Sequence, residues 1–415
     1  MSVGSVRRHL VLVGGGHAHL EVLRQFAERP LLNADVTLVS TFAFHHYSSL
    51  VPGYLQRRHE EREFTFDLRA ICRAARVTFV TGSAEAIETA QQRVIVRGDA
   101  THNLHYDELS LDIGSLPAGE DTAGVRDHAA TVRPMTNAIA LRHRLDALIA
   151  LALERSADVG GACAPRNLPV VVVGAGAGGI EVTLAIARRL HEAGLRGPIT
   201  LVDRGDEPLM DYAPGVQRGI KALLRARGIE LRLGRTVRAV ESLAVTFDDG
   251  TRCDAFLTVW LTGAAASPLM RDAGLATDDS GFLLVNDTLR AEHDAHVWGA
   301  GDCVSLSAHP QLAKAGVYAV REGPILAHNL RAVVDGGPLH RYVPQQQYLA
   351  ILDTGDGCGL LRWRRFSVHT WAALSLKHVI DHRFVRRYQR LGETARPLSF
   401  GIPDGVDPSA HEEAP

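Results

Sequence analysis

The sequence has few cysteines, no excess of either charge and no long apolar segment. Lys and Arg number 45 against 47 Asp and Glu, so no strong field favours nucleic acid as a partner. No apolar stretch reaches the roughly 18 to 20 residues that a membrane-spanning helix needs. The apolar run after Arg7 and Arg8 is too short for a secretory signal before it meets Gly14. We therefore expect a cytoplasmic protein that does not bind nucleic acid.

The five cysteines are widely scattered and form no C-x-x-C array, which is typical of proteins in a reducing compartment. We expect most of them to be buried thiols; they are Cys72, Cys163, Cys253, Cys303 and Cys358. His17 and His19 form an H-x-H pair, but an isolated pair lacks the three or four converging ligands that zinc takes. The sequence therefore predicts no metal site.

The chain is long enough for two or three domains, and its 46% hydrophobic residues are enough for sizeable cores. The strongest signal is a glycine-rich turn that occurs twice, at residues 14–19 (Gly-Gly-Gly-His-Ala-His) and 174–179 (Gly-Ala-Gly-Ala-Gly-Gly). Each turn follows an apolar, β-branched run and opens a segment with helical spacing, the order of elements in a dinucleotide site. Glycines let the backbone approach a pyrophosphate, and the helix N-terminus offers free N–H groups to it. Two such turns predict two bound dinucleotides.

The two turns differ in the residue that follows the next strand. After the first turn that position holds Ser40, where a carboxylate usually bonds the adenosine ribose, although a hydroxyl can still make such a bond. His19 also stands in place of the third glycine. After the second turn the carboxylate is present as Asp203, which favours NADH because it repels the 2′-phosphate of NADPH. The neighbouring Arg204 can accept such a phosphate, so the chemistry leaves NAD(P)H open with NADH preferred.

Three later glycines mark strand ends. Gly114 and Gly263 follow apolar strand-like runs, and Gly301-Asp302 follows a third. A polar, glycine-rich stretch near residues 117–134 indicates a crossing into another domain.

This set of motifs resembles the two-dinucleotide-binding-domain flavoproteins, the pyridine nucleotide-disulfide oxidoreductase superfamily, over nearly the whole chain. More narrowly, the first turn and residues 47–53, 314–321 and 377–384 resemble the subgroup often fused ahead of selenide, water dikinase. That subgroup is similar to type II NADH dehydrogenases and sulfide:quinone oxidoreductases. The C-x-x-x-x-C pair of disulfide reductases is missing after the first helix, so a redox disulfide there is not expected.

The resemblance implies an α/β fold with two Rossmann-like domains. In it, an FAD domain is interrupted by an inserted NAD(P)H domain, and a small α+β region follows. The expected divisions are 1–134 and 266–337 for the FAD domain, 135–265 for the NAD(P)H domain, 338–401 for a C-terminal interface region and 402–415 for a disordered tail.

The resemblance also assigns residues to the cofactors FAD and NAD(P)H. The residues expected to hold FAD are Gly14, Gly15, Gly16, His17, Ala18, His19, Ser40, Gly114, Gly263, Gly301, Asp302 and Lys314. The residues expected to hold the nicotinamide nucleotide are Gly174, Gly176, Gly179 and Asp203.

Five residues are candidates for catalysis: Lys314, His45, His46, Tyr47 and Glu181. A helix expected from Leu312 would direct its N-terminus and Lys314 at the reduced flavin, although a solvated helix lysine is the plainer interpretation. His45, His46 and Tyr47 lie in a loop beyond a strand end, and a histidine near neutral pKa suits proton delivery to an acceptor. A polar surface loop remains the alternative for them. Glu181 would lie near the nicotinamide.

Residues 366–391 combine aromatic and basic side chains and predict a helix that lies on a membrane surface, packs on the protein or forms a homodimer. The expected activity is hydride transfer from NADH to FAD and on to a quinone or another small acceptor. Two alternatives stay open: a sulfide:quinone-type enzyme that uses Cys163 and Cys358, and a non-catalytic redox sensor or scaffold.

Overall fold

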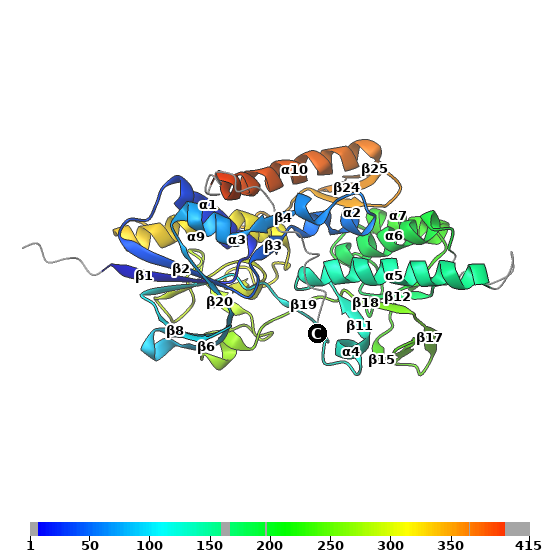
Figure 1. Cartoon of the computed structure of the whole chain (residues 1–415), viewed down its shortest axis with the longest axis horizontal. Helices are drawn as coiled ribbons and strands as arrows, with labels where there is room; N and C mark the ends of the chain where they lie inside the picture. The colour runs from blue at the N-terminus through cyan, green and yellow to red at the C-terminus, as the bar shows by residue number, and fades with distance from the viewer. Residues whose placement is uncertain (1–6, 159–166, 196, 365, 395–415) are drawn as a thin grey trace, which may run out of the picture.

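The computed structural model describes residues 7–158, 167–195, 197–364 and 366–394. Two five-stranded parallel sheets lie side by side, and a C-terminal helix runs across the top of both halves (Figure 1). This arrangement of two Rossmann-like sheets confirms the predicted fold class.

The first sheet carries the N-terminal glycine turn between its central strand and the helix that follows. In spatial order its strands are β21 (Val297–Gly299), β9 (Glu108–Leu111), β1 (Arg8–Val13), β2 (Ala34–Ser40) and β5 (Thr78–Thr81). One face is covered by α1 (His17–Glu28), α3 (Leu68–Ala75) and α9 (Gly316–Asp335). The other face is covered by an antiparallel meander of β6 (Ser83–Glu88), β7 (Arg93–Arg97) and β8 (Thr101–His105).

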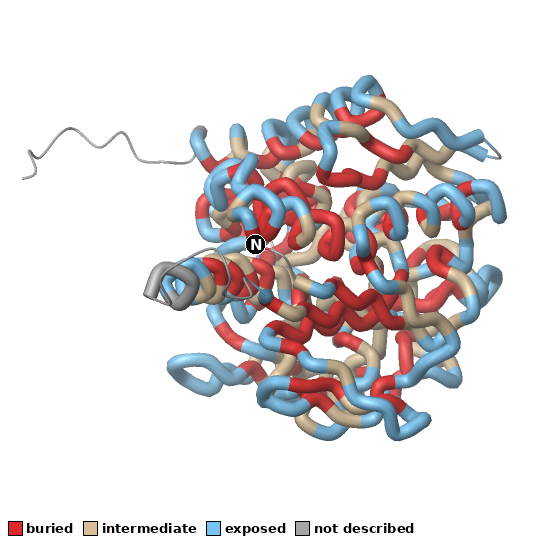
Figure 2. Tube along the Cα trace, turned by 90° about the vertical axis from the view of Figure 1, so that its right-hand side faces the viewer, coloured by how far each residue is buried: buried red, intermediate tan, exposed pale blue. Residues whose placement is uncertain are grey.

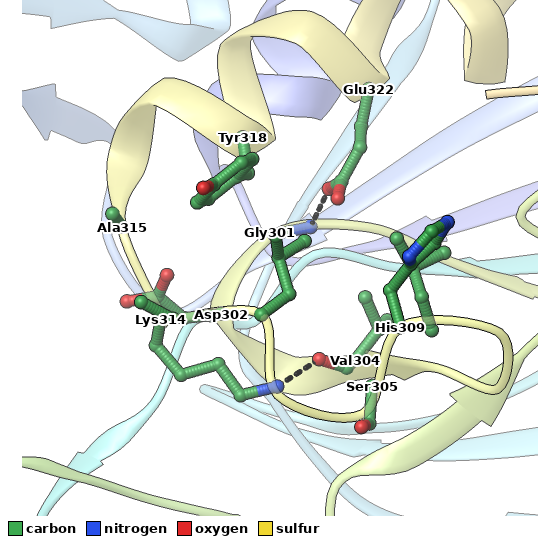
Figure 3. A pocket seen from close by; sticks show the side chains of 12 residues that line it. Gly301, Asp302, Val304, Ser305, His309, Lys314, Ala315, Tyr318 and Glu322 are labelled. Carbon is green, nitrogen blue, oxygen red and sulfur yellow. Dashed lines mark hydrogen bonds between the residues drawn. The ribbon is translucent and has the colours of Figure 1, made fainter. Parts of the chain in front are cut away.

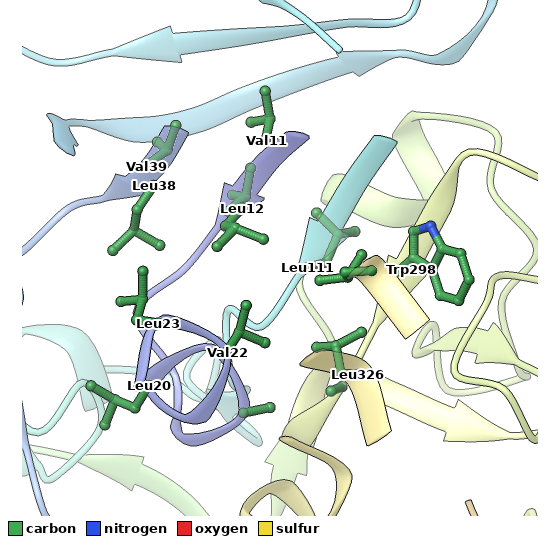
Figure 4. Packing of buried hydrophobic residues seen from close by; sticks show 14 of the residues in the cluster. Val11, Leu12, Leu20, Val22, Leu23, Leu38, Val39, Leu111, Trp298 and Leu326 are labelled. Atoms are coloured by element: carbon green, nitrogen blue, oxygen red, sulfur yellow. The ribbon is translucent and has the colours of Figure 1, made fainter. Parts of the chain in front are cut away.

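The core of this half is formed by apolar side chains of the strands and helices. Leu12 and Leu38 of the sheet face Leu23 of α1, and Leu326 of α9 packs beside Leu111 (Figure 4). Burial of such side chains contributes about 1.5–3 kcal/mol each.

The second sheet has the same plan. Its strands, in spatial order, are β11 (Ala129–Thr131), β18 (Leu257–Trp260), β12 (Val170–Val173), β13 (Ile199–Val202) and β14 (Ile229–Arg232). Three helices pack on one face: α5 (Thr136–Asp158), α6 (Ala177–Glu192) and α7 (Pro214–Ala226). The antiparallel strands β15 (Val237–Val240), β16 (Ala244–Phe247) and β17 (Arg252–Asp254) cover the other. Figure 2 looks onto this half and shows buried segments in its interior.

Two short antiparallel strands connect the halves: β10 (Leu116–Pro117) pairs with β19 (Ala264–Ala265). After the first crossing, α4 (Val125–His128) leads into β11, which already belongs to the second sheet through its pairing with β18. The second sheet therefore includes residues 129–131, which precede the expected domain boundary at residue 135.

Two further segments tie the halves together. The first runs through β3 (Phe44–His46), the short turn η1 (Ser48–Leu50) and α2 (Val51–Leu55), and returns to the first half at β4 (Thr65–Asp67). In α2, Val51 and Leu55 join the core of the second half, and Arg189 of α6 donates to the carbonyl of Leu55.

The second tie is the C-terminal region, an antiparallel sheet of β23 (Ala350–Asp353), β24 (Gly359–Trp363) and β25 (Phe366–Thr370) followed by α10 (Trp371–Thr394). This confirms a C-terminal α+β region. Helix α10 lies over α1 and α3 of the first half, and β23 lies against α6 of the second.

Two expected boundaries are wrong. The helix expected from Leu312 begins at Gly316, so Lys314 precedes it. Residues 366–370 form a strand instead of the start of a helix, because they pair with β24. The residues expected to form a disordered tail lie outside the described part of the chain.

The contact between α1 and α9 depends on Gly323. A Cβ built there would lie 2.7 Å from the Cβ of Glu21 and 3.2 Å from the carbonyl oxygen of Ala18. We expect Gly323→Ala to lower the free energy of unfolding by about 1–3 kcal/mol, because the two helices must move apart. Urea unfolding of the purified protein measures this change.

The matched control is Gly219→Ala in α7, where no atom lies within 4 Å of an added Cβ. There the substitution removes only glycine's flexibility and should stabilise the protein by about 0.5–1 kcal/mol. Equal stabilisation at both positions would show that the close approach of α1 and α9 has no energetic weight.

Candidate functional site

The first glycine turn is held in a conformation that only glycine fits. Gly14 has φ +95°, and a Cβ there would overlap the carbonyl oxygen of Asp112. The turn leads directly into α1, whose first N–H groups are satisfied by a side chain from the neighbouring strand end. The carboxylate of Asp112 accepts from the backbone N–H of His19 at 2.9 Å and fills the space in which a side chain at Gly16 would stand.

Asp112 is fully enclosed, and its charge has little compensation. Burial raises the pKa of its carboxyl to about 7, and the nearby Asp302 adds to the rise. Sequence reasoning missed this residue and treated the segment around it only as a turn. The available signal was an acidic residue directly after the apolar strand β9.

His19 stands where the usual fingerprint has its third glycine, and its side chain packs between the helix and the sheet. Its ring is buried and lies 2.6 Å from the carbonyl oxygen of Gly14 through Nδ1 and 2.8 Å from the Ser110 hydroxyl through Nε2. Burial lowers the pKa of the imidazole to about 4, so it is neutral near pH 7. The ring thus ties α1 to β1 and β9.

Gly301 and Asp302 lie beside this turn, opposite α9. Gly301 has φ +76°, and its N–H donates to Oε2 of Glu322 at 2.7 Å (Figure 3). Burial raises the pKa of Glu322 to about 7 and also raises that of Asp302. The Ser115 hydroxyl reaches Asp302 at 3.5 Å and itself accepts from Arg133 at 2.8 Å.

The ammonium group of Lys314 is already bound within the protein. It donates to the carbonyl of Val304 and lies 4.0 Å from the centre of the Phe282 ring, below Asp302 (Figure 3). Burial lowers its pKa. The residue is therefore neither a solvated lysine nor part of helix α9, and its charge acts on Asp302 through space.

The second turn repeats the geometry of the first. Gly174 has φ +112°, and a Cβ there would overlap the carbonyl oxygen of Leu261. A Cβ at Gly179 would overlap the carbonyl oxygen of Gly174. Two of the three fingerprint glycines therefore have a steric reason, whereas Gly176 faces open space. Asp203 accepts from the N–H of Ala175 at 2.6 Å, so its carboxylate also stabilises the turn.

The backbone fits two dinucleotides at these turns. No protein atom lies within 4 Å of a Cβ built at Gly114, Gly176, Gly178 or Gly263, so the main chain is open to a ligand at both sheet edges. Gly176 and Gly178 thus leave the N-terminus of α6 open to a pyrophosphate, whereas side chains of Leu68 and Asp112 lie against Gly15 and Gly16 before α1. Ser40 donates its hydroxyl to the carbonyl of Phe42 at 2.8 Å, and its oxygen can still accept a bond.

The loop at residues 44–50 separates the three side chains expected to act together. His45 lies against His17 and Phe66, with its buried Nε2 lacking a protein partner. His46 points to the other side of strand β3, toward Glu61 at 3.3 Å. Burial lowers the pKa of His45 well below its usual value, which leaves it a poor proton donor near neutral pH. The geometry does not favour His45 and His46 as a joint relay.

Tyr47 belongs instead to a buried ion pair on α10. Lys377 and Asp381, four residues apart, contact each other at 2.8 Å. The Tyr47 hydroxyl donates to Asp381 at 3.1 Å, the Ser49 hydroxyl donates to it at 3.0 Å, and Lys377 donates to the carbonyl of Ser49 at 2.7 Å. Burial raises the pKa of Tyr47, so it stays protonated. Sequence reasoning noticed the Lys377–Asp381 segment only as a family motif.

Glu181 of α6 completes the cluster from the second half. Its carboxylate accepts from the backbone N–H of Asp353 at 2.8 Å. Burial raises its pKa to about 7, while the charge of Lys377 opposes the rise. A carboxyl with this pKa can both hold and release a proton near neutral pH. The fold therefore places an acid of α6, in the second half, against the C-terminal region and within range of the charge of Lys377.

Within the described residues, Cys72, Cys253, Cys303 and Cys358 are free thiols. Burial raises the pKa of Cys72 and of Cys303 to about 12, so both are inert packing residues near neutral pH. Cys163, the expected partner of Cys358 in the sulfide:quinone alternative, lies outside the described residues.

Comparison with known proteins agrees with this geometry. Residues 8–323 match the family described as pyridine nucleotide-disulphide oxidoreductase. The chain is 29% identical over 307 residues to the NADH dehydrogenase-like protein MT1860 of Mycobacterium tuberculosis, which covers 71% of this chain and 72% of that protein. It is 27% identical over 284 residues to the demethylphylloquinone reductase NdbB of Synechocystis, with 66% and 67% covered. It is 24% identical over 367 residues to the type II NADH:quinone oxidoreductase of Haemophilus influenzae, with 81% and 82% covered.

Solved structures share the fold. NDH2 of Plasmodium falciparum in complex with NADH has a TM-score of 0.79 at 13% identity and covers 94% of this chain and 97% of its own. The sulfide:quinone oxidoreductase of Aquifex aeolicus has a TM-score of 0.74 at 16% identity, with 92% of each chain covered. At such identities the likeness concerns the fold alone.

The raised pKa of Asp112 gives a testable pH dependence. The folded protein holds this proton more tightly than the unfolded chain, so the contribution of Asp112 to stability is lost as the pH rises from about 4 to about 7. We expect the melting temperature of Asp112→Asn to fall less between pH 5 and pH 8 than that of the wild type, without added nucleotide. The exposed Asp279→Asn is the matched control and should follow the wild type; parallel curves for all three proteins would contradict an uncompensated Asp112.

Proposed function

Because the chain belongs to the pyridine nucleotide-disulphide oxidoreductase family, we propose that it is an FAD-dependent enzyme that takes hydride from NADH and passes it to a quinone. The relatives named as NADH dehydrogenase-like proteins, a demethylphylloquinone reductase and a type II NADH:quinone oxidoreductase support this activity. The structural observation that carries it is the position of Glu181 on the helix of the second glycine turn, where its carboxylate accepts from the N–H of Asp353 and feels the charge of Lys377.

When bound, FAD and NADH supply the hydride chemistry, and the protein supplies binding, orientation and charge. We assign FAD to the turn at residues 14–19 with Gly301 and Asp302, and NADH to the turn at residues 174–179 with Asp203. The backbone N–H groups of each turn that Asp112 and Asp203 leave unbonded hold a pyrophosphate, and the positive end of each helix dipole favours its charge. Asp302 and Ser115 offer acceptors and donors to hydroxyl groups of the flavin nucleotide.

Reduction of a quinone to a quinol consumes one hydride and one proton. Glu181 is our candidate for the group that holds this proton, because its pKa is about 7 and Lys377 lies near it. Lys377, Asp381 and Tyr47 position the loop residue Ser49 and shape the field at Glu181. In this proposal Glu181 takes over the proton delivery that the sequence suggested for His45, His46 and Tyr47.

The domain boundaries follow from the same assignment of the two glycine turns to FAD and NADH. We propose an FAD domain from residues before β10 and after β19, an inserted NAD(P)H domain, and a C-terminal region from about residue 338 that joins them. The pairing of β11 with β18 moves the first boundary from residue 134 to a point before residue 129.

An anaerobic titration with NADH tests the activity. The wild type should carry a flavin whose visible absorbance NADH bleaches and a soluble quinone restores, whereas Glu181→Gln should keep the bleaching but slow the quinone step by about 10²–10⁴-fold. Because Glu181 donates only when protonated, wild-type turnover should decline above about pH 7, and the variant should lack this dependence.

The control is Glu192→Gln at the exposed end of the same helix, which should behave as the wild type. A bound flavin that NADH leaves oxidised would count against the enzyme and favour the sensor alternative. Unchanged quinone turnover in Glu181→Gln would remove Glu181 from the reaction.

We further propose that the enzyme meets its quinone at an anionic membrane surface. The tip of β24 and β25 exposes Trp363 and Phe366, and Trp371 at the start of α10 is 71% exposed. Further along α10, basic side chains line an open groove; they include His378, His382, Arg383, Arg386 and Arg387. In the described part of the chain no helix has the length and apolarity to cross a bilayer. Apolar anchors followed by basic groups are typical of surface binding.

Vesicle flotation measures this contact. Full-length protein should bind vesicles that contain phosphatidylglycerol, and Arg383→Gln/Arg386→Gln should weaken binding by about tenfold or more, since each cation near the surface contributes about 1 kcal/mol. The double variant Arg218→Gln/Arg225→Gln on α7 makes the same change in charge elsewhere and should bind as the wild type. Equal binding by both variants, or a dimer that conceals α10, would contradict a membrane contact.

A further inference from the structure

A tight turn between β23 and β24 gathers three different metal-ligating side chains. Asp356 and Cys358 lie in the turn, and His369 lies near the end of β25. One ligand atom of each residue lies within 4.8 Å of the others. None of the three takes part in the nucleotide sites or in the cluster around Glu181.

Strand pairing explains why Cys358 and His369 meet. His369 stands opposite Leu360 in the antiparallel pair of β24 and β25. Residues two apart on a strand share a face, so Cys358 is the diagonal cross-strand neighbour of His369. The sequence gives no sign of this pair, because ten residues and a hairpin lie between them.

The distances suit a tetrahedral ion. Nε2 of His369 lies 3.5 Å from Oδ2 of Asp356. In tetrahedral zinc, with bonds of about 2.0–2.2 Å to nitrogen and oxygen, two ligand atoms stand about 3.4 Å apart. The sulfur of Cys358 lies within 4.8 Å of both of these ligand atoms.

The turn is held in shape by its glycines and by hydrogen bonds among its own residues. Gly355 and Gly357 have φ +74° and +83°, values that favour glycine. The N–H of Cys358 donates to Oδ1 of Asp356 at 3.0 Å, so Oδ2 is the oxygen that faces His369. The buried hydroxyl of Thr354 lies 2.8 Å from Nε2 of His369, so an ion that binds this nitrogen must displace that hydrogen bond.

One protein cation competes for the same oxygen. Arg227 of α7 contacts Oδ2 of Asp356 at 2.6 Å and also donates to the carbonyl of Thr354. A metal ion that uses Oδ2 must displace this guanidinium. Arg227 therefore lowers the affinity of this cluster for a metal ion.

We propose that Asp356, Cys358 and His369 form a binding site for a zinc-like divalent ion, with solvent in the fourth position. A thiolate and an imidazole select zinc over magnesium and calcium, which prefer oxygen ligands. Binding releases the thiol proton of Cys358 to solvent and frees Arg227 from Asp356. No change of oxidation state is involved.

The proposed metal site lies close in sequence to a residue that contacts Glu181, because Asp353 precedes Asp356 by three positions. Asp353, at the start of this turn, donates its N–H to Glu181 and accepts from Gly355 at 2.9 Å. An ion that draws Asp356 and His369 together acts on this turn and through it on Glu181. This consequence rests on the proposed function, whereas binding of the ion does not.

Zinc binding to the full-length holoprotein is measured by competition with a chromophoric chelator, and cobalt substitution reports the ligands. We expect one ion whose affinity falls by more than about tenfold in both Cys358→Ser and His369→Gln. The cobalt complex should show a thiolate-to-metal charge-transfer band that Cys358→Ser lacks. Arg227→Gln should bind zinc more tightly than the wild type.

Cys253→Ser, a half-buried cysteine on β17, is the matched control and should keep the affinity and the band. Circular dichroism identifies any variant that fails to fold, and Arg227→Gln then tests the site without changing a ligand. Affinity that does not depend on Cys358 and His369, or a weaker complex in Arg227→Gln, would overturn the proposal. Flavin bleaching by NADH separates this result from the proposed function, because it does not require zinc.

Discussion

The ion pair between Lys377 and Asp381 is the contact on which the arrangement of the site depends. Both side chains are almost fully buried, and a buried pair is stable only when its remaining donors and acceptors are bonded. Ser49 and Tyr47, from the loop of the first half, supply those bonds. The pair thereby fixes α10 to that loop, while β23 of the same C-terminal region holds Glu181 of the second half. The C-terminal region thus sets the distance between the two nucleotide domains.

Burial shifts the pKa values of the imidazoles and of the carboxyl groups of the site in opposite directions. Around the first glycine turn, His17 and His19 have lowered pKa values and stay neutral, while Asp112 is raised to about 7. Between the halves, the same desolvation brings Glu181 to about 7, close to a neighbouring ammonium group. One physical cause therefore makes imidazoles poor proton donors and a carboxyl group a good one. The choice of proton donor follows from packing, since an isolated histidine titrates nearer neutrality than an isolated glutamate.

The C-terminal region also carries the features that set this chain apart from a bare pair of nucleotide domains. Its hairpin presents aromatic side chains at one end and a turn with three ligating groups at the other, and α10 carries basic groups along its outer side. A short antiparallel sheet can serve several surfaces in this way because alternate residues face opposite sides.

The sequence by itself determined the two strand–turn–helix units, the fold class and the positions of Asp203 and Gly301, because these depend on local backbone geometry and short spacing. Only the tertiary structure decided which side chains meet. His45 and His46 are adjacent in sequence but point to opposite faces of a strand, whereas Tyr47 and Asp381 are far apart in sequence and share a hydrogen bond. Lys314 contacts Val304 and Phe282, and Asp112 accepts a hydrogen bond from the first turn of α1. Such contacts depend on how sheets and helices pack, and periodicity along one chain does not contain that information.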